Sequence, residues 1–227
     1  MSGRLIIIAT PIGNLEDLTP RAREAFAEAD LVLCEDTRRT GRLLAGLGLD
    51  KRLMSLHEHN ERGRVEGLLE MLRQGATLAL ASDAGTPLIS DPGFLLVREA
   101  VAAGLAVEHR PGPSAVMTAL VLSGLPPYPF TFGGFPPRKQ GKRRRFYRSL
   151  AGLEHTLVLF ESPHRLLASL DDAAIALGNR PAALGRELTK LHEEILRGRL
   201  SELRETLAGR PALKGEFTLV IAPPESG

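Results

Sequence analysis

The chain has few of the residues that build disulfide frameworks, zinc sites or long hydrophobic spans. Its 227 residues include one cysteine, Cys34, no tryptophan and only 4% aromatic residues. A single thiol excludes a disulfide framework within the chain and offers no zinc-ligand spacing, which is typical of a reducing compartment. The first apolar run, residues 5–9, is far too short for a signal-peptide core or a membrane span. We therefore expect a cytoplasmic protein with no membrane association.

Charge is nearly balanced overall but unevenly divided along the chain. The formal net charge is +2, yet residues 1–110 carry 13 basic against 16 acidic side chains, and the remainder carries 16 against 11. An acidic half joined to a basic half indicates that the two halves meet different parts of a substrate.

Short apolar segments alternate with helical patterns through the first half. Strands are expected at residues 5–9, 31–34, 52–56, 77–81 and 106–109, and helices at residues 20–29, 37–47, 61–74 and 92–103. Pro20 directly after Thr19 is the pattern of an N-cap followed by proline at the first helical position. The alternation predicts a mostly parallel sheet with helices on both faces.

A break rich in proline and glycine separates the two halves. Residues 110–115 (RPGPSA) begin a segment expected to be helical up to Ser123, and residues 124–142 then contain five prolines and four glycines. Further strands are expected at residues 156–161, 182–186, 193–197 and 217–222, with helices at residues 163–177 and 201–207. The predicted fold class is α/β, with two α/β domains at residues 1–111 and 112–227.

Three loops after predicted strands combine glycine or proline with small polar residues. Their sequences are TPIG at residues 10–13, SDAGTP at residues 82–87 and PGPSA at residues 111–115. Since ligands of open α/β sheets bind beyond the carboxyl ends of strands, three such loops favour a binding site. Neither a dinucleotide fingerprint nor a Walker loop is present. Each loop taken singly is also compatible with an ordinary turn, and Asp83 with helix capping.

Six motifs, spread over nearly the whole chain, together resemble one known family. They are ATPIGNLEDLTPRA, CEDTRRT, SDAGTPLISDPG, PGPSA, FESPHR and RELTK. With them the sequence resembles the tetrapyrrole-methylase superfamily. Within it, the sequence is similar to the bacterial enzymes that methylate a ribose 2′-oxygen of a cytidine in the decoding region of small-subunit (16S) ribosomal RNA. The resemblance implies two α/β domains, S-adenosylmethionine held in the cleft between them, and a homodimer.

The resemblance also implies which residues hold S-adenosylmethionine. These are Thr10, Pro11, Ile12, Gly13, Asp83, Ala84, Gly85, Thr86, Ser114 and Ala115. Asp83 would lie near the positive end of the cofactor, because a sulfonium and an ammonium need carboxylate or carbonyl oxygens. Gly85 would allow backbone amides to approach the cofactor.

Two motifs of the second half carry groups that could assist removal of the ribose hydroxyl proton. The expected catalytic residues are Glu161 of FESPHR and Glu187 and Lys190 of RELTK, each as base or orienter. His164 alone is more compatible with a surface or capping position.

No metal is expected to take part. His57 and His59 are close in sequence but have no other ligand spacing nearby, so we interpret them as part of a loop between a strand and a helix. Methyl transfer of this type requires no metal chemistry.

A basic strip in the second half offers what an RNA substrate needs. Residues 138–148 carry seven positive charges and no negative one. Contacts to RNA are expected from Arg138, Lys142, Arg143, Arg144, Arg145 and Arg165, with Phe146 or Tyr147 available for a splayed base. The alternative is a solvated helix face, but the missing acidic residues favour nucleic acid. The expected partner is therefore ribosomal RNA or the small ribosomal subunit.

Two other functions remain compatible with the motifs. Tetrapyrrole C-methyltransferases share the fold and the cofactor, so the substrate prediction depends on the basic strip, FESPHR and RELTK. A non-catalytic RNA- or nucleotide-binding module would keep the strip but transfer no methyl group.

Many relatives of the ribosomal type continue into a C-terminal extension, whereas this sequence ends soon after its last predicted strand. Whether such an extension is missing stays open, and the affinity for RNA would depend on the presence of the extension.

Overall fold

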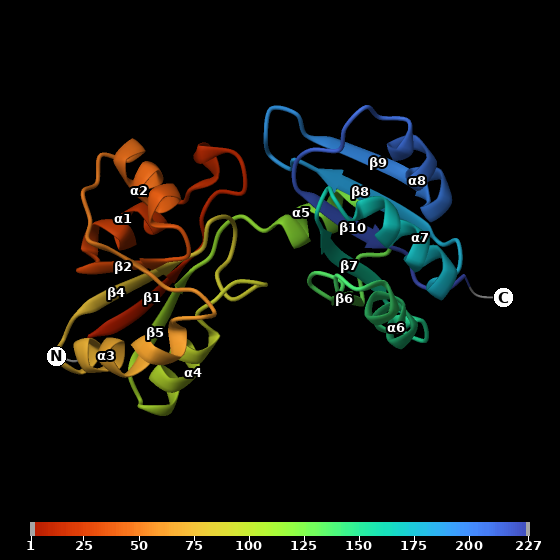
Figure 1. The fold of residues 1–227 in the computed structure, drawn as a ribbon. Helices are drawn as coiled ribbons and strands as arrows, with labels where there is room; N and C mark the ends of the chain where they lie inside the picture. The colour runs from red at the N-terminus through yellow and green to blue at the C-terminus, as the bar shows by residue number, and fades with distance from the viewer. Residues whose placement is uncertain (1–2, 226–227) are drawn as a thin grey trace. The chain divides into compact units, whose positions relative to one another are not determined.

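The chain divides into two compact units, Met1–Ser114 and Ala115–Gly227, and the computed structural model describes residues 3–225. The division falls inside the loop at residues 111–115 that the sequence marks as a junction. Each unit contains one five-stranded sheet flanked by helices, as Figure 1 shows. Within residues 3–225, no helix has both the length and the apolar character needed to cross a membrane.

The sheet of the first unit is parallel, with strand order β3-β2-β4-β1-β5. Its strands are β1 (Arg4–Ile8), β2 (Leu31–Cys34), β3 (Leu53–Ser55), β4 (Thr77–Ala81) and β5 (Ala106–Arg110). They are connected by η1 (Leu15–Asp17), α1 (Pro20–Glu28), α2 (Thr37–Gly46), α3 (Glu61–Arg73) and α4 (Phe94–Ala102). The predicted α/β class and the parallel sheet are confirmed.

Alternate residues of these strands supply two cores on opposite faces of the sheet. Leu5 of β1 packs in a cluster with Leu68 of α3 and Leu96 of α4. The next residue, Ile6, packs in a second cluster with Phe26 of α1 and Leu44 of α2. Because strand side chains alternate between faces, helices cover both sides of the sheet, as predicted.

Local sequence decides where two helices of this unit begin. The Thr19 side chain accepts a hydrogen bond from Ala22 N at 3.2 Å, and Pro20 occupies the first position of α1, as predicted. Helix α4 begins at Phe94 rather than at the predicted Pro92. The cause is Gly93, whose φ of +112° is left-handed and does not continue into a helix.

The second unit has a mixed sheet of order β6-β7-β10-β8-β9. Its strands are β6 (Phe130–Phe132), β7 (Thr156–Glu161), β8 (Pro181–Arg186), β9 (Glu194–Arg199) and β10 (Phe217–Ile221). Strands β6 and β7 pair in parallel, and the other neighbouring pairs are antiparallel. Antiparallel pairing of β8 and β9 follows from their direct connection, because a parallel pair would need a crossover.

The helices of the second unit are α5 (Ala115–Ser123), α6 (Gln140–Leu150), α7 (Leu166–Leu177) and α8 (Leu200–Ala208). Helices α6, α7 and α8 share one core with the sheet, around residues such as Leu159, Leu170 and Leu203. Strand β6 and helix α6 were not predicted, since the prolines and glycines of residues 124–142 obscured both.

Candidate functional site

The loops after β1 and β4 are joined by backbone hydrogen bonds. Thr10 N donates to Gly85 O at 2.8 Å, and Gly85 N donates to Thr10 O at 3.0 Å, which forms an isolated antiparallel bridge. The buried Thr10 hydroxyl donates to Ser82 O at 3.1 Å. Two of the loops singled out in the sequence are therefore joined to each other at the carboxyl ends of the neighbouring strands β1 and β4.

The loop after β5 lies against the same pair. Gly85 has a φ of +81°, and a Cβ added here would lie 3.4 Å from Ile12 Cγ2 and 3.9 Å from Pro113 O. A Cβ at Gly112 would lie 3.1 Å from Ala9 Cβ. A residue other than glycine at position 85 would have a strained backbone conformation. Its side chain would lie between the three loops. Gly85 therefore lets the three loops lie close together with their main-chain groups near one another.

Most of the residues expected to contact the cofactor lie in these loops. Thr10 and Ile12 are buried, Pro11, Ala84, Thr86 and Ser114 are partly buried, and Gly13 is exposed. Ala115 is the exception, since it opens α5 in the second unit.

Asp83 has partners that the sequence did not reveal. Its Oδ1 accepts a hydrogen bond from Asp36 N at 3.2 Å, and its Oδ2 forms an ion pair with Arg39 Nη1 at 3.3 Å. Both partners belong to the motif CEDTRRT, in which Asp36 caps α2 by accepting from Arg38 N at 2.8 Å. The Asp83 carboxylate is 23% exposed and partly neutralised by Arg39. CEDTRRT therefore positions Asp83.

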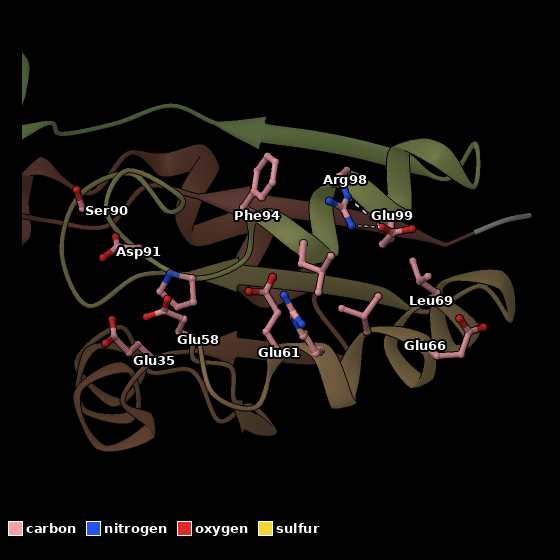
Figure 2. A pocket seen from close by; sticks show the side chains of 14 residues that line it. Glu35, Glu58, Glu61, Glu66, Leu69, Ser90, Asp91, Phe94, Arg98 and Glu99 are labelled. Atoms are coloured by element: carbon pink, nitrogen blue, oxygen red, sulfur yellow. Dashed lines mark hydrogen bonds and ion pairs between the residues drawn. The ribbon is translucent and has the colours of Figure 1, made fainter. Parts of the chain in front are cut away.

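The second half of the same loop lines a hollow of about 980 Å³ beside α3 and α4. Figure 2 shows its side chains, which include six carboxylates and two arginines, and we call it the acidic groove. The lining residues are Glu35, Glu58, Glu61, Arg62, Val65, Glu66, Leu69, Ser90, Asp91, Pro92, Phe94, Leu95, Arg98 and Glu99. Buried Glu61 accepts from Leu96 N at 3.0 Å and so joins α3 to α4.

The acidic groove holds a carboxyl group with an altered proton affinity. Burial, and next the negative charge of Glu35, raise the pKa of Asp91 from 3.8 to about 6, although a hydrogen bond with Ser82 opposes the shift. An RNA phosphate would be repelled by this groove, because its carboxylates outnumber its arginines.

We expect Asp91→Asn to raise the thermal unfolding midpoint at pH 8 by roughly 2–4 °C and to have little effect near pH 4. The folded chain binds the Asp91 proton more tightly than the unfolded chain, so wild type loses stability as the pH rises from about 4 to about 6. Asn cannot ionise and avoids this loss. Thermal unfolding monitored by circular dichroism at several pH values tests this, with exposed Asp50→Asn as control. An equal effect at pH 4 and pH 8 would contradict it.

RELTK forms a tight turn after β8 in the second unit. Glu187 and Thr189 have φ values of +50° and +63°, which non-glycine residues rarely adopt. Glu187 Oε1 accepts from Lys190 Nζ at 2.9 Å and from Glu216 N at 2.8 Å. A Cβ at Gly215 would lie 2.7 Å from the Glu187 carboxyl carbon, so glycine is required there to make room.

This arrangement keeps Glu187 ionised and Lys190 protonated. Burial acts to raise the pKa of Glu187, but the Glu216 N–H and Lys190 outweigh it and hold that pKa below its usual value. Burial acts to lower the pKa of Lys190, but bonds to Glu187 and Glu216 outweigh it and raise that pKa. A protonated lysine has no lone pair to accept a proton. Of the two, Glu187 is the candidate base and Lys190 positions it.

Glu161 of FESPHR is buried, with a side chain that is 1% exposed. Its Oε1 accepts from Ser162 N at 2.8 Å and pairs with Arg165 Nη2 at 3.1 Å. Arg165 also donates to Ser162 Oγ at 2.9 Å and to Pro136 O at 3.2 Å, whereas His164 is exposed. Glu161 therefore holds Arg165, and Arg165 holds the loop before α6. These contacts speak against a ribose contact by Glu161, and the phosphate contact by Arg165 stays a prediction.

The basic strip folds as α6, and its side chains point to different sides. Arg143 is buried and binds Asp172 Oδ2 of α7 through Nε at 2.8 Å and Nη2 at 2.7 Å. Arg144 Nε binds Asp172 Oδ1 at 2.6 Å, with 37% of its side chain exposed. Tyr147 is also buried, its hydroxyl 2.7 Å from Ser169 Oγ. Arg143 is thus occupied by Asp172 and Tyr147 by Ser169, and their burial speaks against the expected RNA contact of Arg143 and base contact of Tyr147.

The remaining cations of the strip are exposed. They are Arg138, Lys139, Lys142, Arg145 and Arg148, and we call them the exposed basic face. The last three recur every third residue and so share one side of α6. The inward residues were detectable, since positions 143, 147 and 150 have the spacing of a buried helix face.

The described part of the chain, residues 3–225, contains no group of three or more His, Cys, Asp or Glu side chains arranged to hold a metal ion. His57 instead takes part in a local turn: its backbone N donates to Asn60 Oδ1 at 2.9 Å, and its Nε2 lies 3.0 Å from Asn60 Nδ2.

Known proteins are similar to this chain in sequence or in fold. Residues 4–204 match the family described as Tetrapyrrole (Corrin/Porphyrin) Methylases. The chain is 49% identical over 221 residues to Ribosomal RNA small subunit methyltransferase I of Micromonospora olivasterospora, covering 97% of this chain and 71% of that protein. It is 45% identical over 223 residues to the protein of the same name from Thermotoga maritima, covering 98% of this chain and 100% of that protein.

A solved structure with the same fold is that of uroporphyrin-III C-methyltransferase from Thermus thermophilus complexed with S-adenyl homocysteine. The TM-score is 0.66 at 20% identity, with 97% of each chain covered. At this identity the likeness establishes the fold alone.

Proposed function

The chain belongs to the tetrapyrrole (corrin/porphyrin) methylase family, and we propose that it methylates the RNA of the small ribosomal subunit. The observation that carries this proposal is the 45–50% identity to ribosomal RNA small subunit methyltransferases over nearly the whole chain. The methyl donor is S-adenosylmethionine, and the acceptor is a ribose 2′-oxygen of a cytidine in the decoding region. A tetrapyrrole substrate has weaker support, because the uroporphyrin enzyme is only 20% identical.

The joined loops at Thr10, Gly85 and Pro113 support an S-adenosylmethionine site in the first unit. When bound there, S-adenosylmethionine supplies an electrophilic methyl group on a sulfonium. The space that a side chain at position 85 would fill suits a ligand held by main-chain groups. Asp83 offers a carboxylate to the cationic end, and Arg39 fixes its orientation through the ion pair.

In the second unit, Glu187 removes the proton of the acceptor hydroxyl. As the ribose oxygen attacks the methyl carbon, the carbon–sulfur bond breaks and the sulfur keeps the electron pair, so the hydroxyl proton must leave. Glu187 is ionised and held at Oε1 by Lys190 and by Glu216 N. The left-handed backbone at Glu187 and Thr189 is the kind of strain that concentrates in functional loops.

The exposed basic face of α6 binds the RNA backbone. Lys142, Arg145 and Arg148 lie on one side of the helix, and Arg138 precedes it, so several phosphates can be contacted together. The proposed partners are thus the small ribosomal subunit and, from the family likeness, a second copy of the chain, in the cytoplasm where the subunit is found. A mass near 24.5 kDa by light scattering, the mass of one chain, would contradict the proposed dimer.

Small subunits from cells that lack the protein test the function directly. Incubated with the purified chain and S-adenosylmethionine labelled in its methyl group, they should gain about one label each, at a ribose of a decoding-region cytidine. Mass spectrometry of nuclease fragments locates the label, and subunits from wild-type cells are the control because their site is already modified. Label on a base or on no RNA at all would contradict the proposal.

A further inference from the structure

An exposed phenyl ring follows β6 in the second unit. Phe135 is 51% exposed, and its ring centroid lies 5.4 Å from that of Phe160 of β7. The Phe160 ring lies 5.0 Å from that of Phe132 of β6, in an edge-to-face arrangement. Single exposed apolar side chains are common on protein surfaces. This one differs because it packs against the partly buried Phe160 ring, which the Phe132 ring of the neighbouring strand supports in turn.

The backbone on both sides of Phe135 is also held. Phe160 N donates to Gly134 O at 3.0 Å, and Arg165 Nη1 donates to Pro136 O at 3.2 Å. Arg165 is fixed in turn by its ion pair with buried Glu161. The motif FESPHR therefore reaches the loop of Phe135 and keeps the ring presented to solvent.

Cations follow directly after this ring. Phe135 and Arg138 are three residues apart, so they lie within about 11 Å of each other. Arg143 Nη1 donates to Arg138 O at 3.1 Å, which ties the start of α6 to the buried pair with Asp172. The sequence from residue 135 to residue 153 contains no carboxylate. An aromatic face thus adjoins a surface that attracts phosphates.

We infer that Phe135 and the exposed basic face of α6 form a subsite for a single-stranded nucleotide, whose base stacks on the phenyl ring while its flanking phosphates lie on the cations. Proteins read single-stranded RNA by stacking its bases on aromatic side chains beside basic residues. This inference rests on the proposed function and names the surface that holds the RNA. It also replaces Tyr147, which is buried, as the residue that receives a base.

Phe135→Leu tests the inference, since it keeps an apolar side chain and removes the aromatic face. Binding to small subunits from cells lacking the protein should weaken about 10- to 100-fold, the range of one stacked base. Phe135→Trp should bind like wild type. The slope of log affinity against log salt should stay unchanged in Phe135→Leu, because no phosphate contact is lost. In Lys142→Gln the slope should become shallower, with its magnitude smaller by roughly 0.7, because one phosphate contact is lost.

Matched controls separate this subsite from the proposed function. Phe94→Leu alters a phenyl that is 63% exposed but lines the acidic groove, and it should not affect subunit binding. S-adenosylmethionine affinity and circular dichroism should match wild type in all variants. If wild type methylates subunits and Phe135→Leu binds them as tightly, the subsite is refuted and the function stands. If wild type transfers no methyl group while Phe135→Leu weakens binding and Phe135→Trp restores it, the function is refuted and the subsite stands.

Discussion

Glu187→Gln should lower the rate of methyl transfer by about 10²-fold or more, within the range contributed by a positioned general base. The amide has nearly the same shape, and its oxygen can still accept from Glu216 N and Lys190 Nζ, which lie 2.8 Å and 2.9 Å from Glu187 Oε1. It cannot take up the ribose proton. Single-turnover transfer of labelled methyl groups to small subunits measures the effect, and S-adenosylmethionine affinity should change less than about twofold.

Glu216→Gln is the matched control for this change. Glu216 Oε2 lies 3.0 Å from Lys190 Nζ, but its side chain is 62% exposed, so it shares the cation without being held in the turn. Its replacement should alter the transfer rate only slightly, because exposed ion pairs contribute little. A comparable loss of rate in both variants would indicate that the transfer rate depends on the negative charge beside Lys190. Glu187 would then lose its assignment as the base.

Gly85→Val should abolish detectable S-adenosylmethionine binding, because a β-branched side chain would block the approach of the backbone to the ligand. Valine at φ +81° is strained, and its side chain would meet Ile12 and Pro113 in the space between the three loops. Isothermal titration calorimetry measures the affinity. Circular dichroism should show an unchanged fold, because only the loop at the edge of the sheet is altered.

Gly104→Val is the control for backbone strain. Gly104 has a φ of +66° and follows α4, and a Cβ there meets nothing within 4 Å. The variant therefore carries a similar left-handed strain away from the three loops, and its cofactor affinity should equal that of wild type. Wild-type affinity in Gly85→Val would place the cofactor elsewhere. An equal loss in both variants would point to general destabilisation.

The sequence by itself determined the α/β class, the parallel sheet of the first unit and the positions of the loops that lie together after its strands. These follow from local signals: short apolar runs form strands, and Thr19 with Pro20 starts a helix. The resemblance singled out Gly85. The structure shows its positive φ and its bridge to Thr10, which explain why a glycine stands there. In the second unit, prolines and glycines hid β6, and α6 was not predicted although positions 143, 147 and 150 have the spacing of a buried helix face.

The tertiary structure decided which charged groups are available. Arg143 is buried because Asp172, on another helix, neutralises it, and Glu161 is buried because Arg165 does the same. A charge can leave water only where a partner compensates for lost solvation, and a partner distant in the chain is not visible in a local pattern. Asp91 has no such partner within residues 3–225: burial, and next the negative charge of Glu35 from the loop after another strand, raise its pKa. Which residues carry charge is set by the sequence, but which of them can meet a substrate is set by the fold.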